Sequence, residues 1–135
     1  MNQKITYHFV WGPMRNKPCL TGEAAERLQS LIDEAADLLS VDLEEVEVFP
    51  DRVYVSVAAP PTVSPHRIVC RFKAHSSHCL RREFQEMTRI PTLWTRTYVV
   101  QAGEHLRPEQ VLELFEASLP PRRRPGRPKS CGGPE

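Results

Sequence analysis

The feature that most constrains the fold is the alternation of two hydrophobic periodicities along the chain. Apolar residues recur at helical spacing over two long segments, 22–39 and 64–84, and this spacing predicts two amphipathic helices. Between them, the stretch 41–57 alternates apolar and polar residues on both sides of a Pro-Asp pair at 50–51. Alternation interrupted by such a turn predicts two strands paired as a hairpin.

Further elements are expected on both sides of this pattern. The segments ITYHFVW at 5–11 and LWTRTYVVQ at 93–101 have the apolar and aromatic content of strands. A short helix is expected to begin at Arg107-Pro108. The resulting order, β-α-β-β-α-β and a last helix, predicts an α+β fold: a ferredoxin-like sandwich with helices on one face of an antiparallel sheet. The other sheet face would be available for a ligand, a partner or the C-terminal helix.

The strand that follows the turn places contrasting residues on its two sides. Val53, Val55 and Val57 share one side, while Arg52 and Tyr54 share the other. The valine side is expected in the core.

Composition favours one domain, residues 1–119, followed by a tail at 120–135. The tail, PPRRRPGRPKSCGGPE, is too rich in proline, glycine and arginine to bury apolar surface, so disorder is expected. Its stretch RRRPGRPK is similar to an AT-hook, in which Arg124 and Arg127 would extend along the minor groove of A·T-rich duplex DNA. The alternative is a solvated basic terminus that binds polyanions without preference.

Charge is divided along the domain as well. The stretch 28–51 holds eight acidic residues and no basic one, whereas 52–82 holds six basic residues and no acidic one. This division favours one acidic and one basic surface, and a basic surface suits a polyanion. Two ordinary solvated faces remain the alternative.

The four cysteines form no C-x-x-C pair, so reduced thiols are expected. The sequence has no apolar run of membrane-spanning length, and its start has no signal-peptide pattern. The chain is therefore expected to be cytoplasmic and to have no membrane partner.

Four quoted segments carry a family resemblance. YHFVW at 7–11, GEAAERLQSLIDEAADLLSVDLEEVEVFPD at 22–51, SPHRIVCRFKAHSSHCLRREF at 64–84 and LWTRTYVV at 93–100 occur in an order and spacing that resemble the single-tyrosine HUH transposases of small bacterial insertion sequences. This family includes the REP-associated tyrosine transposases. The resemblance implies cutting and joining of single-stranded DNA at hairpin-bearing ends, and a homodimer paired through its sheets.

The resemblance also implies a catalytic site that this chain alters. In the family, two histidines on the strand after the Pro-Asp turn bind Mg²⁺ or Mn²⁺, a tyrosine of the last helix attacks the phosphate, and a glutamine completes the metal site. Here the two histidine positions hold Arg52 and Tyr54, and the last helix has Leu114 for the tyrosine and Ser118 for the glutamine. Arginine stays charged and a neutral phenol is a poor ligand. We therefore expect no metal cofactor and no strand cleavage.

Two residues at these positions have alternative interpretations. Tyr54 could be a relocated nucleophile beside Arg52, but packing beneath the last helix is the favoured interpretation. For Arg52, the structural interpretation is an ion pair with Asp51 or a nearby glutamate.

The resemblance implies that DNA contacts the loop after the first strand and the helix at 64–84. By position, the candidates are Arg15, Asn16 and Lys17 in the loop and Arg67, Arg71, Lys73, His75, Ser76, Ser77, Arg81 and Arg82 on the helix. Phosphate contacts would supply affinity, and the shape of a hairpin or an unpaired base would supply selectivity.

A zinc site could also be drawn from His66, Cys70, His75, His78 and Cys79, although a chance cluster on this helix is favoured. The main hypothesis is thus a transposase-like protein that binds hairpin or single-stranded DNA without cutting it. Its rivals are an active nuclease or strand transferase with an unconventional site, and a protein-interaction module that no longer binds DNA.

Overall fold

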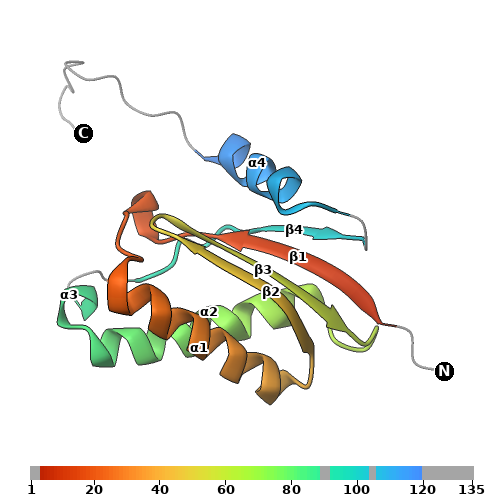
Figure 1. Ribbon diagram of the computed structural model, residues 1–135, viewed down its shortest axis with the longest axis horizontal. Coiled ribbons are helices and arrows are strands. Elements are labelled where there is room, and N and C mark those ends of the chain that lie inside the picture. The colour runs from red at the N-terminus through yellow and green to blue at the C-terminus, as the bar shows by residue number, and fades with distance from the viewer. Residues whose placement is uncertain (1–3, 89–91, 104–105, 120–135) are drawn as a thin grey trace.

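The computed structural model describes residues 4–88, 92–103 and 106–119. Four strands form one antiparallel sheet in the order β2-β3-β1-β4, which is the arrangement of the predicted ferredoxin-like sandwich (Figure 1). The strands are β1 (Ile5–Trp11), β2 (Asp42–Phe49), β3 (Arg52–Ala59) and β4 (Val99–Ala102).

Two long helices cover one face of this sheet, as the sequence predicted. They are α1 (Gly22–Leu39) and α2 (Pro65–Glu83), and they run side by side beneath the strands (Figure 1). Ser64 caps α2, because its Oγ accepts a hydrogen bond of 3.1 Å from the Arg67 amide. Thr21 lies at the N-cap of α1, but its side chain makes no capping bond.

The main core lies between the helices and the inner face of the sheet. Val53, Val55 and Val57 point into it and are fully buried, as their alternation predicted. Trp11 of β1 stacks on Phe72 of α2 with the ring centroids 6.2 Å apart. The apolar residues of the strands and of the helices, predicted from periods of two and 3.6 residues, thus pack together in one core.

The predicted strand at 93–101 is wrong for most of its length. Strand β4 pairs with β1 only from Val99 onward, and before it Trp94 makes an isolated bridge to Pro13. The preceding segment is held by α2 instead: Trp94 Nε1 donates to the Lys73 carbonyl at 3.1 Å, and Lys73 Nζ donates to the Thr95 carbonyl at 2.6 Å. Contacts with α2, together with backbone hydrogen bonds from Met14 to Leu93 and from Thr95 to Gly12, therefore replace the expected sheet ladder.

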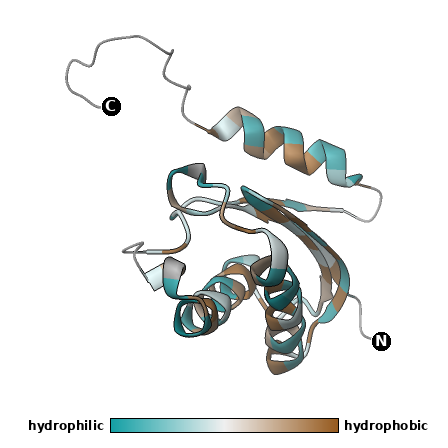
Figure 2. Ribbon diagram, turned by 60° about the vertical axis from the view of Figure 1, so that its left-hand side comes forward, coloured by the Kyte–Doolittle hydropathy of each residue, from teal (hydrophilic) through white to brown (hydrophobic). Residues whose placement is uncertain are grey.

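Three further helical elements complete the described chain. A single 3-10 turn, η1 (Met14–Asn16), follows β1, and a short helix, α3 (Gln85–Thr88), follows α2; the sequence predicted neither. The expected last helix is α4 (Pro108–Ser118), and the sheet separates it from α1 and α2 (Figures 1 and 2). Within the described residues, no helix has the length and hydropathy needed to cross a membrane.

Candidate functional site

The sheet face beneath α4 holds the strand residues that the resemblance marked. Tyr54 is 1% exposed and packs in a small apolar cluster with Val10, Val111 and Phe115. Val111 and Phe115 are the buried residues of α4, so this helix is attached to the sheet largely through Tyr54 and its neighbours. The favoured interpretation of Tyr54, a strand aromatic packed beneath the last helix, is confirmed.

The Tyr54 hydroxyl belongs to a buried hydrogen-bond chain. It lies 2.8 Å from Nδ1 of His8, and Nε2 of His8 lies 2.7 Å from the carbonyl oxygen of Gly103. A carbonyl can only accept, so Nε2 carries the proton and donates, which leaves Nδ1 of the neutral imidazole to accept from the hydroxyl. The phenol is therefore committed as a donor within the fold.

Sequence reasoning missed His8. Its position in ITYHFVW was assigned to a strand, but nothing in the sequence said which residue would lie opposite it. In the sheet, His8 pairs with Ser56 of β3 and with Gln101 of β4, and its side chain is 4% exposed. The available signal was the period of two, which places His8 and Val10 on the same side of β1.

Arg52 is held by two carboxylates. Its Nε and one terminal nitrogen donate to Asp51 at 3.1 and 3.2 Å, and the other terminal nitrogen lies 2.8 Å from Oε1 of Glu116 on α4. Its guanidinium carbon also lies 5.2 Å from the ring centroid of Phe115. The predicted ion pair is confirmed with both partners, and it links the start of β3 to α4.

The electrostatics of this face do not suit a divalent cation. Burial opposes the charge on Arg52, yet the hydrogen bonds that it donates to Asp51 and Glu116, with the negative charge of these carboxylates, outweigh burial and raise the pKa of Arg52. Burial, followed by the nearby β2 carboxylates, raises the pKa of Tyr54 to about 12, so the phenol stays neutral. A fixed guanidinium and a neutral buried phenol do not fit the Mg²⁺ or Mn²⁺ that the resemblance implies.

Helix α4 offers no tyrosine at the position where the resemblance expects the nucleophile. Residues 108–118 contain no tyrosine. Leu114 is 45% exposed, and Ser118 Oγ donates to the Phe115 carbonyl at 2.7 Å. Phe115 itself is buried in the small cluster under the helix.

The predicted DNA-binding residues of α2 differ in how exposed they are. Arg67, Arg71 and Arg82 are exposed, and their spacing of four and eleven residues places them on one side of the helix. Ser77 and Arg81 are half-buried. The three exposed arginines form what we call the outer arginine row of α2.

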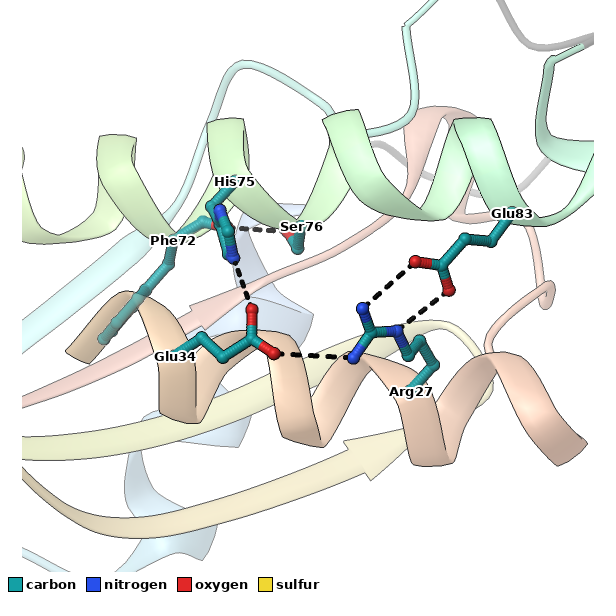
Figure 3. Close-up of polar contacts among 6 residues, drawn as sticks. All are labelled: Arg27, Glu34, Phe72, His75, Ser76 and Glu83. Atoms are coloured by element: carbon teal, nitrogen blue, oxygen red, sulfur yellow. Dashed lines mark hydrogen bonds and ion pairs between the residues drawn. The ribbon is translucent and has the colours of Figure 1, made fainter. Parts of the chain in front are cut away.

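Three other candidates on α2 have partners within the fold. The Lys73 ammonium bonds the Thr95 carbonyl, and partial burial lowers its pKa. Nε2 of His75 lies 3.0 Å from Glu34, which also approaches Arg27, as Figure 3 shows. Ser76 is fully buried and donates to the Phe72 carbonyl at 2.6 Å, so its predicted place on the DNA-facing surface is wrong.

The loop candidates are exposed where the structure describes them. Arg15 and Lys17 are both solvent-exposed, and Arg15 adopts a left-handed conformation with φ of 60°. The backbone of Asn16 belongs to η1, but its side chain lies outside the described part. The predicted tail, with Arg124 and Arg127, also lies outside the described residues.

The five residues of the zinc alternative do not come together. His75 faces Glu34 on α1, whereas His66 and Cys70 lie beside Tyr98. Within the described ranges, no three histidine, cysteine, aspartate or glutamate side chains are grouped closely enough to hold a metal ion. The thiols of Cys19, Cys70 and Cys79 are free.

Comparisons with known proteins found a matching family model and similar solved folds. The family model described as "Transposase IS200 like" matches residues 1–114. A candidate transposase from Deinococcus radiodurans R1 has a similar fold, with a TM-score of 0.78 and 22% identity over 87% of this chain and 92% of the other. A REP-associated tyrosine transposase bound to a REP hairpin is also similar, with a TM-score of 0.60 and 12% identity over 87% and 72% of the two chains. No curated protein matches the sequence.

Proposed function

This chain belongs to the IS200-like transposase family, and from that premise we propose that it binds hairpin or single-stranded DNA without cutting it. The observation that carries the proposal is the use of Arg52 and Tyr54 as structural residues. Both occupy the positions where the family binds its metal, and both are bonded within the fold. The chain retains the scaffold of the family, and the residues at the family's metal-binding positions, Arg52 and Tyr54, hold α4 on the sheet instead.

DNA binding is assigned to the outer arginine row of α2 together with Arg15 and Lys17. Supporting this, the row is exposed, and the similar REP-associated transposase was solved with a REP hairpin. Guanidinium groups recognise phosphate through paired hydrogen bonds. The β2 edge is a poor alternative surface, since Glu44, Glu45 and Glu47 are exposed along it and would repel a polyanion.

Loss of cleavage follows from what the reaction requires. The family mechanism needs a cation to polarise the phosphate and a tyrosine on the last helix to attack it. The Tyr54 hydroxyl donates to His8 and keeps its proton, so it is a poor nucleophile. The homodimer of the family and A·T-rich duplex binding by the tail belong to the same proposal.

The binding test uses the full chain and a fluorescein-labelled DNA hairpin with a single-stranded flank. Replacing Arg67 and Arg71 together by Gln is expected to weaken binding at least about tenfold and to lower the salt slope by about two. Arg107→Gln is the matched control, because Arg107 is exposed at the start of α4 rather than on α2. Equal affinity for the double variant and the control would refute the assigned surface, and no binding at micromolar protein would favour an interaction module.

The cleavage test incubates the same DNA with protein and Mg²⁺ or Mn²⁺. We expect intact DNA and no protein that carries a covalently attached strand on a denaturing gel. A cleaved product or an adduct would show that the chain is an active strand transferase. If Tyr54→Phe then abolished the adduct, Tyr54 would be the relocated nucleophile.

A further inference from the structure

A second group of polar side chains, His66, Cys70 and Tyr98, lies at the first half of α2. Cys70 is exposed, and its Sγ lies 3.4 Å from Nε2 of His66, one helical turn earlier. The other ring nitrogen of His66, Nδ1, lies 3.0 Å from the hydroxyl of Tyr98. The rings of His66 and Tyr98 also lie close, with centroids 6.1 Å apart.

These distances define a thiol, a base and an orienting group. The imidazole tautomer with its proton on Nδ1 donates to the Tyr98 oxygen and leaves Nε2 free to accept the thiol proton of Cys70. A nucleophile, a base within reach and a third group that fixes the base form the arrangement that activates cysteine nucleophiles. None of these three side chains contributes to the packing of α4 or to the outer arginine row.

Cationic side chains near Cys70 in the sequence attract anions. Arg67 and Arg71 are exposed at three residues before and one residue after Cys70, and Lys73 lies 5.8 Å from the Tyr98 ring centroid. These cations would draw an anionic reagent toward the thiol. The other described thiols differ: Cys19 and Cys79 are half-buried, and burial raises the pKa of Cys19.

We propose that Cys70 is a thiol-modification site that reacts with small anionic disulfides. His66 takes the proton from the thiol, and the thiolate sulfur attacks one sulfur of the disulfide. A new S–S bond forms to Cys70 as the old S–S bond breaks, and the second half of the reagent leaves as a thiolate that takes up a proton. The disulfide is the oxidant, so the exchange is balanced without a further reactant, and a free thiol reverses it.

The expected consequence is weaker DNA binding, and this part rests on the proposed function. A glutathione adduct at Cys70 would place carboxylates beside Arg67, which lies one helical turn earlier and is assigned to phosphate contact. Local anions there would compete with DNA and reduce the favourable electrostatic contribution to binding.

The first test measures adduct formation alone, by mass spectrometry of the full chain with oxidised glutathione. Cys131→Ser is used as the background, so that the three described thiols are compared. Peptide mapping is expected to show Cys70 modified at least about tenfold faster than Cys79, and faster than Cys70 of the same protein unfolded in guanidinium. A folded rate no higher than the unfolded rate would refute activation of this thiol.

Paired histidine variants test the role of His66. His66→Ala is expected to slow modification of Cys70 about tenfold, whereas His78→Ala, which changes another exposed histidine of α2, leaves the rate unchanged. Tyr98→Phe is expected to give a smaller loss, because the base remains but loses its orienting oxygen. Equal rates for the two alanine variants would overturn the proposed role of His66.

The second test compares hairpin DNA affinity before and after modification, with Cys70→Ser treated in the same way. Modified protein is expected to bind at least about tenfold more weakly and to recover on reduction, while the Cys70→Ser protein does not respond. If the unmodified protein does not bind DNA, the proposed function fails but the mass result still decides the modification site. If modified protein binds DNA unchanged, the site is not coupled to DNA binding.

Discussion

The two faces of the sheet show how differently one set of strands can be used. On the face that α1 and α2 cover, β3 presents valines that are fully buried in the core. On the face beneath α4, the same strand presents Arg52, Tyr54 and Ser56, and only a small apolar cluster accompanies them. The first face is stabilised by the burial of apolar surface, and the second by hydrogen bonds and ion pairs.

This difference separates the part that specifies the fold from the part where function can change. Apolar packing spreads stability over many contacts, so the family scaffold survives substitutions elsewhere. The α4 face depends on a few partners, such as His8 for Tyr54 and Glu116 for Arg52. Substitutions at Arg52 or Tyr54 would therefore alter the α4 face while the sandwich remains.

The largest effect is expected in the main core. Phe72 is fully buried and packs against Phe9 and Trp11. Phe72→Ala should lower the free energy of unfolding by about 3–5 kcal/mol, measured by urea unfolding. Leu38→Ala is the control, since Leu38 is 68% exposed on α1 and its loss should change little. A cost below about 1 kcal/mol for Phe72→Ala would contradict the dominance of this face.

A matched aromatic on the other face should behave differently. Phe115 is as buried as Phe72, but it holds a single short helix. Phe115→Ala is expected to release α4 locally, at a cost of about 2 kcal/mol, and to remove hydrogen-exchange protection from residues 108–118 while α1 and α2 keep theirs. Loss of protection throughout the domain would show that the two faces unfold as one unit.

Loss of the buried Tyr54 hydroxyl is expected to have an intermediate effect on the free energy of unfolding. Tyr54→Phe leaves Nδ1 of His8 without its donor and should lower the free energy of unfolding by about 1–2 kcal/mol. Urea unfolding of the single variants and of Tyr54→Phe combined with His8→Phe measures the coupling. A double variant whose cost equals the sum of the two single costs would mean that the hydrogen bond contributes nothing.

The same tyrosine predicts a response to alkali. Its pKa is raised from 10.0 to about 12 in the folded protein, so between these values the folded state binds more protons than the unfolded state. Stability should therefore fall as pH rises above 10 and stop falling near 12. Tyr54→Phe should reduce this slope in unfolding measurements between pH 9 and pH 12. An unchanged slope would mean that Tyr54 titrates normally.

The smallest effect on stability is expected for ion pairs, and one on each side of the sheet can be compared. Arg52 has a side chain that is 15% exposed between Asp51 and Glu116, whereas Arg27 is 35% exposed between Glu34 and Glu83. Arg52→Gln should cost about 1 kcal/mol. Arg27→Gln should change thermal unfolding less, and both effects should shrink in high salt. A larger effect at Arg27 would reverse the comparison.

The order of elements was accessible from sequence because it depends on local periodicity. The apolar spacing at 22–39 and 64–84 predicted both long helices, and the alternation of β3 predicted which residues enter the core. The fourth strand was overextended because Leu93 and Trp94 have strand-like composition, but Trp94 finds its hydrogen-bond partners on α2. Composition cannot show which neighbour satisfies a polar group.

By itself, the sequence determined the sandwich and the side of each strand that is buried, and it placed Arg52 and Tyr54 together on the opposite side of β3. Tertiary structure alone decided which partners those residues have. His8 lies 46 residues from Tyr54, and Glu116 lies 64 from Arg52, and such pairs meet only when sheet register and helix docking bring them together. The same reason explains Ser76. Its place in a helix was predicted correctly, but its hydroxyl accepts a hydrogen bond from Trp94 inside the core.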